Sequence, residues 1–263
     1  ICKSIKAATS HAVYGCDVQQ AVLDDAIADG AIDGTGTMTD GTYDMIILCL
    51  HQRIAIQMVQ EALPKIPAGT ILVDTCGLKG RMVRDLTYRC RKADVRYVGT
   101  HPMAGREKNG YYASIPNLFQ NANLIVTPVD GTDEAALDTV KELADQMGFG
   151  KIVTATPMWH DNMIAYTSQL AHVVSSSYVK DFCMDDALSF SGGSFQDMTR
   201  VARLDEDMWT ELFLDDADYL TDELDILIGH LQEYADALKS KDAEHLRALL
   251  RDGREKKATA GGN

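Results

Sequence analysis

Apolar residues in the first part of the chain form short continuous runs that alternate with amphipathic segments. The apolar runs at residues 12–17, 43–50, 70–74, 95–99, 123–127 and 151–155 predict β-strands. Between them, apolar residues recur at helical spacing at residues 19–29, 54–63, 79–92 and 132–147. Strands that are apolar throughout and separated by helices are typical of a mostly parallel sheet with both faces covered. The pattern predicts an α/β domain over residues 1–155.

After Pro157 the pattern becomes helical throughout. Residues 159–181, 208–238 and 243–250 predict three helices, with a Ser- and Gly-rich break at residues 189–194. We therefore expect an all-α domain over residues 156–263, with a solvated and mobile tail from residue 254. The long helices carry more apolar positions than one buried face needs. Either a helix of a second subunit covers them, or they pack within one chain.

Composition and charge narrow the classes of partner. The chain has 263 residues, 46% of them hydrophobic, and a formal net charge of −14. This charge argues against nucleic acid or an anionic membrane as the main partner, and an anionic substrate would need locally concentrated cations. The sequence shows no apolar run of membrane-spanning length and no signal-peptide pattern. The 6 cysteines are scattered, and we expect reduced thiols in a cytoplasmic protein.

His101 follows the predicted strand at residues 95–99, where a strand ends and a loop begins. In an open α/β sheet this carboxyl edge is where ligands bind. Pro102 biases His101 toward an extended backbone, and Gly105 permits a tight turn. A histidine with an ordinary pKa of about 6.5 can accept or donate a proton near neutral pH. The alternative is a surface histidine without a chemical role.

Two further strand ends carry candidate cofactor contacts. Asp17 ends a strand, where a carboxylate accepts hydrogen bonds from an adenosine ribose in dinucleotide-binding sheets. A helix N-cap explains Asp17 equally well. Asp74 closes another strand, and the backbone N–H groups up to Lys79 are placed to face a cofactor or substrate oxygen. For Lys79 the alternative is a solvated lysine in the first helical turn.

The first predicted helix of the all-α half carries several polar residues. His160 and Asp161 lie near its start, and Ser168 and His172 are four residues apart on one face, with Gln169 between them. Such residues either line a cleft or are buried with backbone partners. Their spacing excludes HExxH zinc chemistry, and no metal site is predicted.

Arg200 lies in a dense patch at residues 192–203. It is suited to hold a carboxylate through two parallel hydrogen bonds, with Asp197 orienting it. The alternative is a surface Asp–Arg pair, worth at most about 1 kcal/mol. Trp209 is expected in the core.

Together these segments resemble the prephenate/arogenate dehydrogenase family of tyrosine biosynthesis. Residues 101–107 resemble its HPMAG-x-E signature, and residues 74–79 its D-x-x-S-V-K segment. Residues 160–161 match its HD pair, residues 168–172 its S-H-L-P-H segment, and residues 195–202 its F-R-D-x-T-R-x-A segment. The motifs occur in the family's order.

The resemblance implies a Rossmann-like domain joined to a helical dimerisation domain, and hence a homodimer. It implies NAD-dependent oxidative decarboxylation of prephenate to 4-hydroxyphenylpyruvate, or of arogenate to tyrosine. His101 would accept the proton of the ring hydroxyl. The implied catalytic positions are His101, Gly77 and Glu107. The implied substrate contacts are Arg200, His172, Ser168, Gln169, Asp197 and Arg106, and the implied cofactor contacts are Asp17, Asp74 and Lys79.

Three positions depart from the family pattern. Gly77 replaces a serine, Gln169 replaces the first histidine of S-H-L-P-H, and Arg106 replaces a small hydroxyl residue. The Gly-rich dinucleotide fingerprint is absent from the sequence, and we expect a first strand and loop of about a dozen residues in the natural protein. A dimeric binding protein without catalysis is the rival hypothesis.

Overall fold

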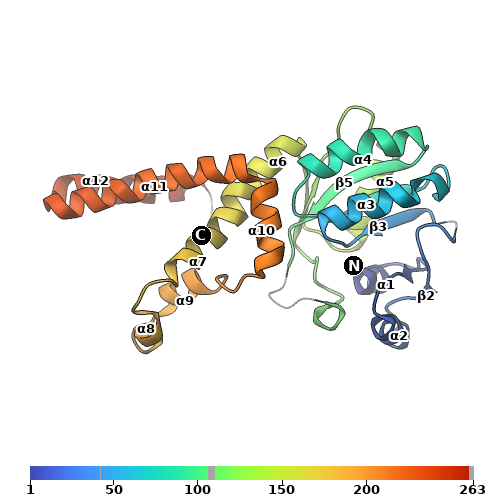
Figure 1. Ribbon diagram of the computed structural model, residues 1–263, viewed down its shortest axis with the longest axis horizontal. Coiled ribbons are helices and arrows are strands. Elements are labelled where there is room, and N and C mark those ends of the chain that lie inside the picture. Colours follow the sequence, from blue (N-terminus) through green and yellow to red (C-terminus); the bar gives the residue numbers. More distant parts are fainter. Residues whose placement is uncertain (42, 106–109, 261–263) are drawn as a thin grey trace.

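The computed structural model describes residues 1–41, 43–105 and 110–260 (Figure 1). Helices and strands alternate through the N-terminal part, as the apolar pattern predicts. In chain order the elements are α1 (Cys2–Ala8), β1 (Tyr14–Gly15), α2 (Gln20–Ala28), β2 (Gly34–Thr35), β3 (Met45–Leu48), α3 (Gln52–Ala62), the 3-10 turn η1 (Leu63–Lys65), β4 (Ile71–Asp74), α4 (Gly80–Lys92), β5 (Arg96–Pro102), the 3-10 turn η2 (Tyr111–Ala113), β6 (Asn123–Val126), α5 (Glu134–Gln146) and β7 (Lys151–Thr154).

The main sheet has five strands in the order β3-β4-β5-β6-β7, and β1 and β2 form a separate parallel pair. All neighbours in the main sheet are parallel except β5 and β6, which are antiparallel. The connection from β5 to β6 contains only η2 among its described residues, and an antiparallel neighbour needs no crossover helix. The predicted α/β, mostly parallel sheet is confirmed.

Both faces of the main sheet are covered by helices. Leu72 packs in a core cluster with residues of α3 and α4, whereas its neighbours Ile71 and Val73 pack in a second cluster with residues of α5. Successive side chains of a strand point to opposite faces, so one short apolar run serves both cores. This explains why the strands read as continuously apolar.

The C-terminal part is helical in all its described elements. These are α6 (Pro157–Ile164), the π-helical segment η3 (Ala165–Gln169), α7 (Leu170–Tyr178), α8 (Met184–Phe190), α9 (Gly193–Thr199), α10 (Glu206–Asp215), α11 (Ala217–Ser240) and α12 (Ala243–Thr259). Side-chain caps mark three helix starts: Thr156, Asp205 and Asp242 accept backbone N–H groups of α6, α10 and α12.

The structure corrects three of the sequence expectations here. The single helix predicted over residues 208–238 is wrong, because the chain leaves helical geometry at buried Asp216 (φ −123°, ψ 21°) and forms α10 and α11. Helices α8 and α9 were not predicted, since each has only 7 residues. Residues 254–259 of the expected solvated tail are exposed, but they are helical and continue α12.

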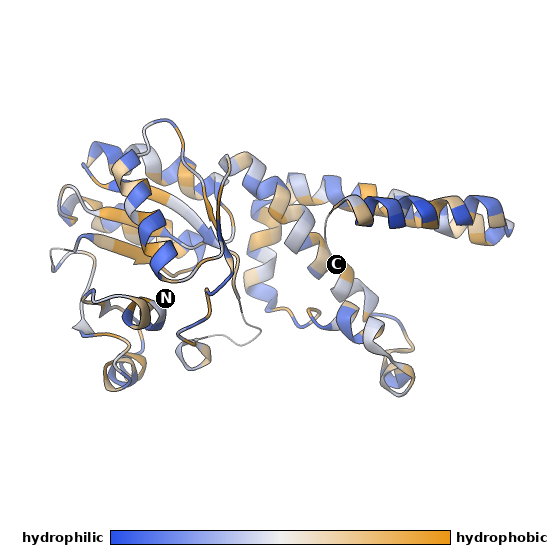
Figure 2. Cartoon of the chain, turned by 180° about the vertical axis from the view of Figure 1, so that it is seen from behind, coloured by the Kyte–Doolittle hydropathy of each residue, from blue (hydrophilic) through white to orange (hydrophobic). Residues whose placement is uncertain are grey.

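Helices α11 and α12 form a hairpin that projects away from the rest of the chain (Figure 1). Figure 2 shows apolar and polar residues intermixed along this arm. Several large apolar side chains on it are exposed, namely Ile226, Ile228, Leu231, Leu238 and Leu250. No helix of the described chain is long and apolar enough to span a membrane.

Candidate active site

Strand β5 positions His101. The expectation that His101 follows a strand end is wrong, because β5 continues through Pro102 and pairs His101 with Ile125 of β6. The imidazole is half-buried, and its Nδ1 lies 2.9 Å from Nε2 of His160. The pairing of β5 with β6 therefore fixes the backbone of His101, and the contact with His160 fixes its imidazole.

A chain of hydrogen bonds continues from His160 into the α/β domain. His160 is buried in α6, and its Nδ1 lies 2.7 Å from Oδ1 of Asp161. The Asp161 carboxylate accepts the backbone N–H groups of Lys79 at 2.8 Å and Gly80 at 2.7 Å. A Cβ atom at Gly80 would lie 2.8 Å from Asp161 Oδ2, so this approach requires glycine. The first turn of α4 and the helical domain are thus joined at the catalytic candidate.

Beneath His101 lies a fully buried ion pair. The Lys79 ammonium donates to Oδ1 of Asp74 and, at 2.6 Å, to the carbonyl of Thr100, and neither charged side chain is exposed. Tyr97 donates its hydroxyl to Oδ2 of Asp74 at 2.6 Å, and the backbone N–H of Cys76 donates to Oδ1 at 2.9 Å. The solvated-lysine alternative is wrong. Asp74 and Lys79 are in the interior, where they fix the ends of β4 and β5 and the first turn of α4.

Burial and charge keep His101 neutral. Its pKa falls to about 3, first because burial disfavours the imidazolium, then through the nearby His160 and Lys79. A neutral imidazole has one nitrogen lone pair available. His101 is therefore suited to accept a proton over the whole physiological pH range, although its low basicity requires a site that stabilises the product cation.

Gly77 lies in the loop between β4 and α4. A Cβ atom there would contact only Cδ2 of Leu212, at 3.9 Å, which is ordinary van der Waals contact. The loop thus has room for the serine of the family pattern. Leu212 belongs to α10, so this helix covers the loop.

Helix α10 is held against the α/β domain by charged and polar groups that are far apart in the sequence. Asp215 accepts hydrogen bonds from Arg81 of α4 at 3.1 and 3.2 Å and from Gln52 of α3 at 3.2 Å. Arg53 lies 2.9 Å from Glu211. Only the tertiary fold brings these positions, more than 130 residues apart for Arg81 and Asp215, together.

A second group of candidates lies in the helical domain. His172 stacks on Trp209 of α10, with ring centroids 4.0 Å apart, and its Nδ1 lies 2.8 Å from the carbonyl of Ser168. Trp209 is half-buried, so the core expectation holds only in part. Gln169 is buried in η3, and its Oε1 has no hydrogen-bond partner among the described residues. The structure thus places Gln169 in the interior and His172 at a half-buried position.

The remaining candidates lie elsewhere. Asp197 and Arg200 are exposed in α9 and at its end, and α9 packs against α7 through the rings of Phe195 and Tyr178. Asp17 is exposed, and its Oδ1 accepts the backbone N–H of Gln19 at 2.8 Å, just before α2. Arg106 and Glu107 lie outside the described residues.

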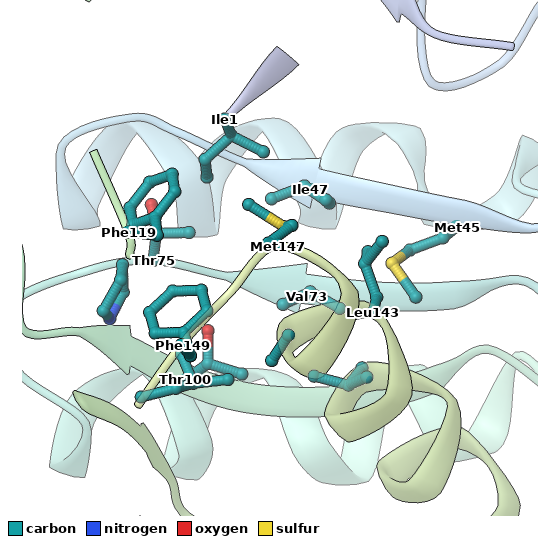
Figure 3. A pocket seen from close by; sticks show the side chains of 14 residues that line it. Ile1, Met45, Ile47, Val73, Thr75, Thr100, Phe119, Leu143, Met147 and Phe149 are labelled. Atoms are coloured by element: carbon teal, nitrogen blue, oxygen red, sulfur yellow. The ribbon is translucent and has the colours of Figure 1, made fainter. Parts of the chain in front are cut away.

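A small apolar cavity of about 50 Å³ lies between β3–β5 and α5 (Figure 3). Side chains including Ile1, Ile47, Phe119, Met147 and Phe149 point into it. It is too small and too apolar for an anionic substrate, because a void of this kind holds neither water nor charge readily. In the described chain, no group of three or more His, Cys, Asp or Glu residues is arranged to hold a metal.

Comparison with known sequences decides the family. Residues 1–154 match the family described as "Prephenate dehydrogenase, nucleotide-binding domain", and residues 156–252 match "Prephenate dehydrogenase, dimerization domain". The chain belongs to the prephenate dehydrogenase family. All the motifs that carried the resemblance lie within these two ranges.

Individual relatives agree with this membership. The cyclohexadienyl dehydrogenase of Zymomonas mobilis is 31% identical over 77% of this chain and 70% of its own length. The prephenate dehydrogenase of Bacillus subtilis is 28% identical over 89% of this chain and 65% of its own length. The chain thus spans about two thirds of the length of these relatives.

Solved structures extend the likeness to the fold. Prephenate dehydrogenase from Aquifex aeolicus, in complex with hydroxyphenyl propionate and NAD⁺, is 26% identical with a TM-score of 0.85, covering 98% of this chain and 93% of that one. Arogenate dehydrogenase from Synechocystis has a TM-score of 0.80 at 21% identity, covering 98% of this chain and 95% of that one, which shows the shared fold alone.

Proposed function

We propose that this protein catalyses the NAD-dependent oxidative decarboxylation of prephenate to 4-hydroxyphenylpyruvate. In this proposal residues 1–155 bind the cofactor, and residues 156–263 complete the substrate site and the dimer. The observation that carries it is a neutral His101, anchored through His160 and Asp161 at the junction of the two domains. A proton acceptor at this junction is what the reaction requires.

The segments that follow strands β1 and β4 are suited to bind a dinucleotide. Asp17 keeps an exposed carboxylate just after β1, suited to ribose hydroxyls, and its Oδ1 accepts the backbone N–H of Gln19, the N-cap residue of α2. The loop around Gly77 leaves open space at the end of β4. Bound NAD⁺ would supply the hydride acceptor.

His101 then takes the proton of the ring hydroxyl while hydride leaves the carbon that bears it. The carbon–carboxylate bond breaks, carbon dioxide departs, and the electron pair of that bond makes the ring aromatic, leaving a phenolate oxygen that takes the proton back from His101 to give the 4-hydroxyphenyl product. The hydrogen-bond chain to Asp161 spreads the positive charge that His101 acquires. The ring system gains aromaticity, which supplies much of the driving force.

Prephenate carries two carboxylates, and this chain has a net charge of −14, so a local cation is required. Arg200 at the end of α9 is our candidate, with His172 on the neighbouring helix α7. Ser168 and Asp197 remain proposed substrate contacts. Buried Gln169 is better suited to support α6 and α7 than to touch the substrate.

The test is NADH formation, followed by absorbance, with prephenate and arogenate offered separately. We expect turnover with prephenate, and a loss on the order of 10²–10⁴-fold in kcat for His101→Asn. Turnover only with arogenate would change the substrate and keep the mechanism. No turnover with either, from a protein that binds NAD⁺, would favour the non-catalytic binding protein.

We also propose a homodimer that covers the exposed apolar residues of α11 and α12. The family's dimerization domain includes this arm, and Ile228 and Leu231 are each more than half exposed. Leu231→Glu should convert the dimer to a monomer in light scattering, because a buried unpaired charge opposes association. Gln232→Glu, an exposed neighbour on the same helix, is the matched control and should stay dimeric. A dimeric Leu231→Glu variant would place the interface elsewhere.

A further inference from the structure

Hydrogen-bond accounting along the His101–His160–Asp161 chain determines which nitrogen of each ring carries a proton. Asp161 is its fixed end. Both carboxylate oxygens face backbone N–H donors, of Lys79 and of Gly80, which can only donate. A carboxylate accepts all three groups that face it, the two backbone N–H groups and the Nδ1–H of His160, whereas a protonated Asp161 would turn its own O–H toward Nδ1 and weaken both backbone contacts. Asp161 is therefore a carboxylate, and its contact with Nδ1 of His160 requires the imidazole to donate.

The proton on Nδ1 of His160 leaves its Nε2 as an acceptor when the ring is neutral. A second proton on His160 would place a cation near the buried Lys79 ammonium, which already disfavours positive charge on His101. Other charged groups face this chain: Asp74, paired with Lys79, and Asp216, which acts on Asp161 from the junction of α10 and α11. Because Nδ1 of His160 already donates to Asp161, its Nε2 is the nitrogen that accepts from His101.

We propose that His160 and Asp161 are positioning residues that hold the proton of His101 on Nδ1, so that Nε2 is the atom that accepts the substrate proton. The 2.9 Å contact then runs from the Nδ1–H of His101 to Nε2 of His160. Among the described residues no partner is recorded for Nε2 of His101, which is therefore available. The proposal rests on the proposed function for the identity of the proton donor, but the tautomer itself is a property of the protein alone.

The substitution Asp161→Asn should reverse the tautomers of both histidines, while the side chain at position 161 keeps nearly the same shape. With its oxygen at the Oδ2 position the amide still accepts the Gly80 N–H, whereas its NH₂ at the Oδ1 position gives up the Lys79 N–H and donates toward Nδ1 of His160. His160 then carries its proton on Nε2, His101 must accept at Nδ1, and its own proton moves to Nε2. The proton acceptor is lost although every side chain remains in place.

Nitrogen-15 NMR of histidine-labelled protein tests the tautomers without cofactor or substrate. At pH 8 we expect the His101 signals of an Nδ1–H tautomer in the wild type, assigned by their absence from His101→Asn, and an Nε2–H tautomer in Asp161→Asn. Asp133→Asn is the matched control, because Asp133 also accepts a backbone N–H of a helix start but lies in α5. An Nε2–H tautomer in the wild type, or the same tautomer in Asp161→Asn and the wild type, would overturn the proposal.

Kinetics give an independent readout. With prephenate, Asp161→Asn should lose on the order of 10²–10⁴-fold in kcat with KM within about 3-fold, as expected when a base is present in the wrong tautomer. Gly80→Ala should cause a smaller loss of the same kind, because its methyl group displaces Oδ2 of Asp161, whereas Gly193→Ala has open space at the same helical position. A decrease in kcat that is matched by an equal increase in KM would indicate that Asp161 has a merely structural role. An inactive wild type with the expected tautomer would refute the function and leave this inference standing.

Discussion

Asp74 and Asp216 are both buried carboxyl groups, but among the described residues only Asp74 of the two forms an ion pair, with Lys79. Asp74 receives the Lys79 ammonium, the Tyr97 hydroxyl and a backbone N–H. Asp216 has one oxygen, Oδ2, without a hydrogen-bond partner among the described residues. Burial, and then the charge of Asp161, raise the pKa of Asp216 to about 7. Burial without a cation thus holds the Asp216 carboxyl toward its neutral form, although the Gln169 side chain donates a hydrogen bond to it.

The difference follows from the positions of the two residues. Asp74 ends a central strand, where neighbouring strands and the first turn of α4 supply donors from several directions. Asp216 lies at a break between two helices, where α10 ends and α11 begins. The buried Asp74–Lys79 pair holds the backbone around His101 in place. The Asp216 carboxyl makes the junction of α10 and α11 sensitive to pH.

Breaking the paired site should have the largest effect. Lys79→Met leaves Asp74 buried without its cation, so we expect the free energy of unfolding in urea to fall by about 3–5 kcal/mol. The double variant Asp74→Asn/Lys79→Met removes both charges and should recover much of this loss. A single variant as stable as the wild type would mean that the ion pair contributes nothing to the fold.

Neutralising the unpaired site should stabilise the protein, in a way that depends on pH. The pKa of Asp216 is raised in the fold from its ordinary 3.8, so its contribution is present below that value and is lost as pH rises through about 7. Asp216→Asn should therefore raise the unfolding free energy by about 1–3 kcal/mol at pH 8 and leave it nearly unchanged at pH 4.

Exposed Asp222 on α11 offers the control for this comparison. Asp222→Asn makes the same chemical change on the same helix and should shift stability little at either pH. Each variant is compared with the wild type at the same pH, so the opposite contribution of His101, whose pKa is lowered, cancels. The same stabilisation at pH 4 and pH 8 would show that Asp216 is already ionised at pH 4.

The two carboxylates also show which features of the site can be predicted from the sequence. The strand that ends at Asp74 was predicted because its residues are continuously apolar, and the resemblance singled out Asp74, Lys79 and His101. That Lys79 turns inward was not predictable, because a lysine after a strand is usually solvated and only the fold reveals the Thr100 carbonyl and Asp74 as its partners. The break at Asp216 was missed since apolar spacing continues through it.

Other parts of the site depend on long-range packing in the same way. His160 was noted as one of a pair with Asp161, but its contact with His101 joins residues 59 positions apart in different domains. No local pattern encodes such a contact. Gly80 became meaningful only with the fold, because a Cβ atom there would lie 2.8 Å from Oδ2 of Asp161.

The smallest expected effect on the unfolding free energy comes from deleting one buried hydroxyl. Two variants compare a hydroxyl that has a hydrogen-bond partner with one that has none among the described residues. Tyr97→Phe removes a 2.6 Å donor from Oδ2 of Asp74 and should cost about 1–2 kcal/mol of unfolding free energy, because a buried charged oxygen loses its partner. Ser175→Ala removes a buried hydroxyl that has no partner among the described residues, and should change stability by less than about 0.5 kcal/mol or increase it. Urea unfolding of both variants at pH 7 measures the pair. Equal costs would mean that the polar atoms of the two regions are satisfied to the same degree, and the contrast between Asp74 and Asp216 would then reduce to the Lys79 charge alone.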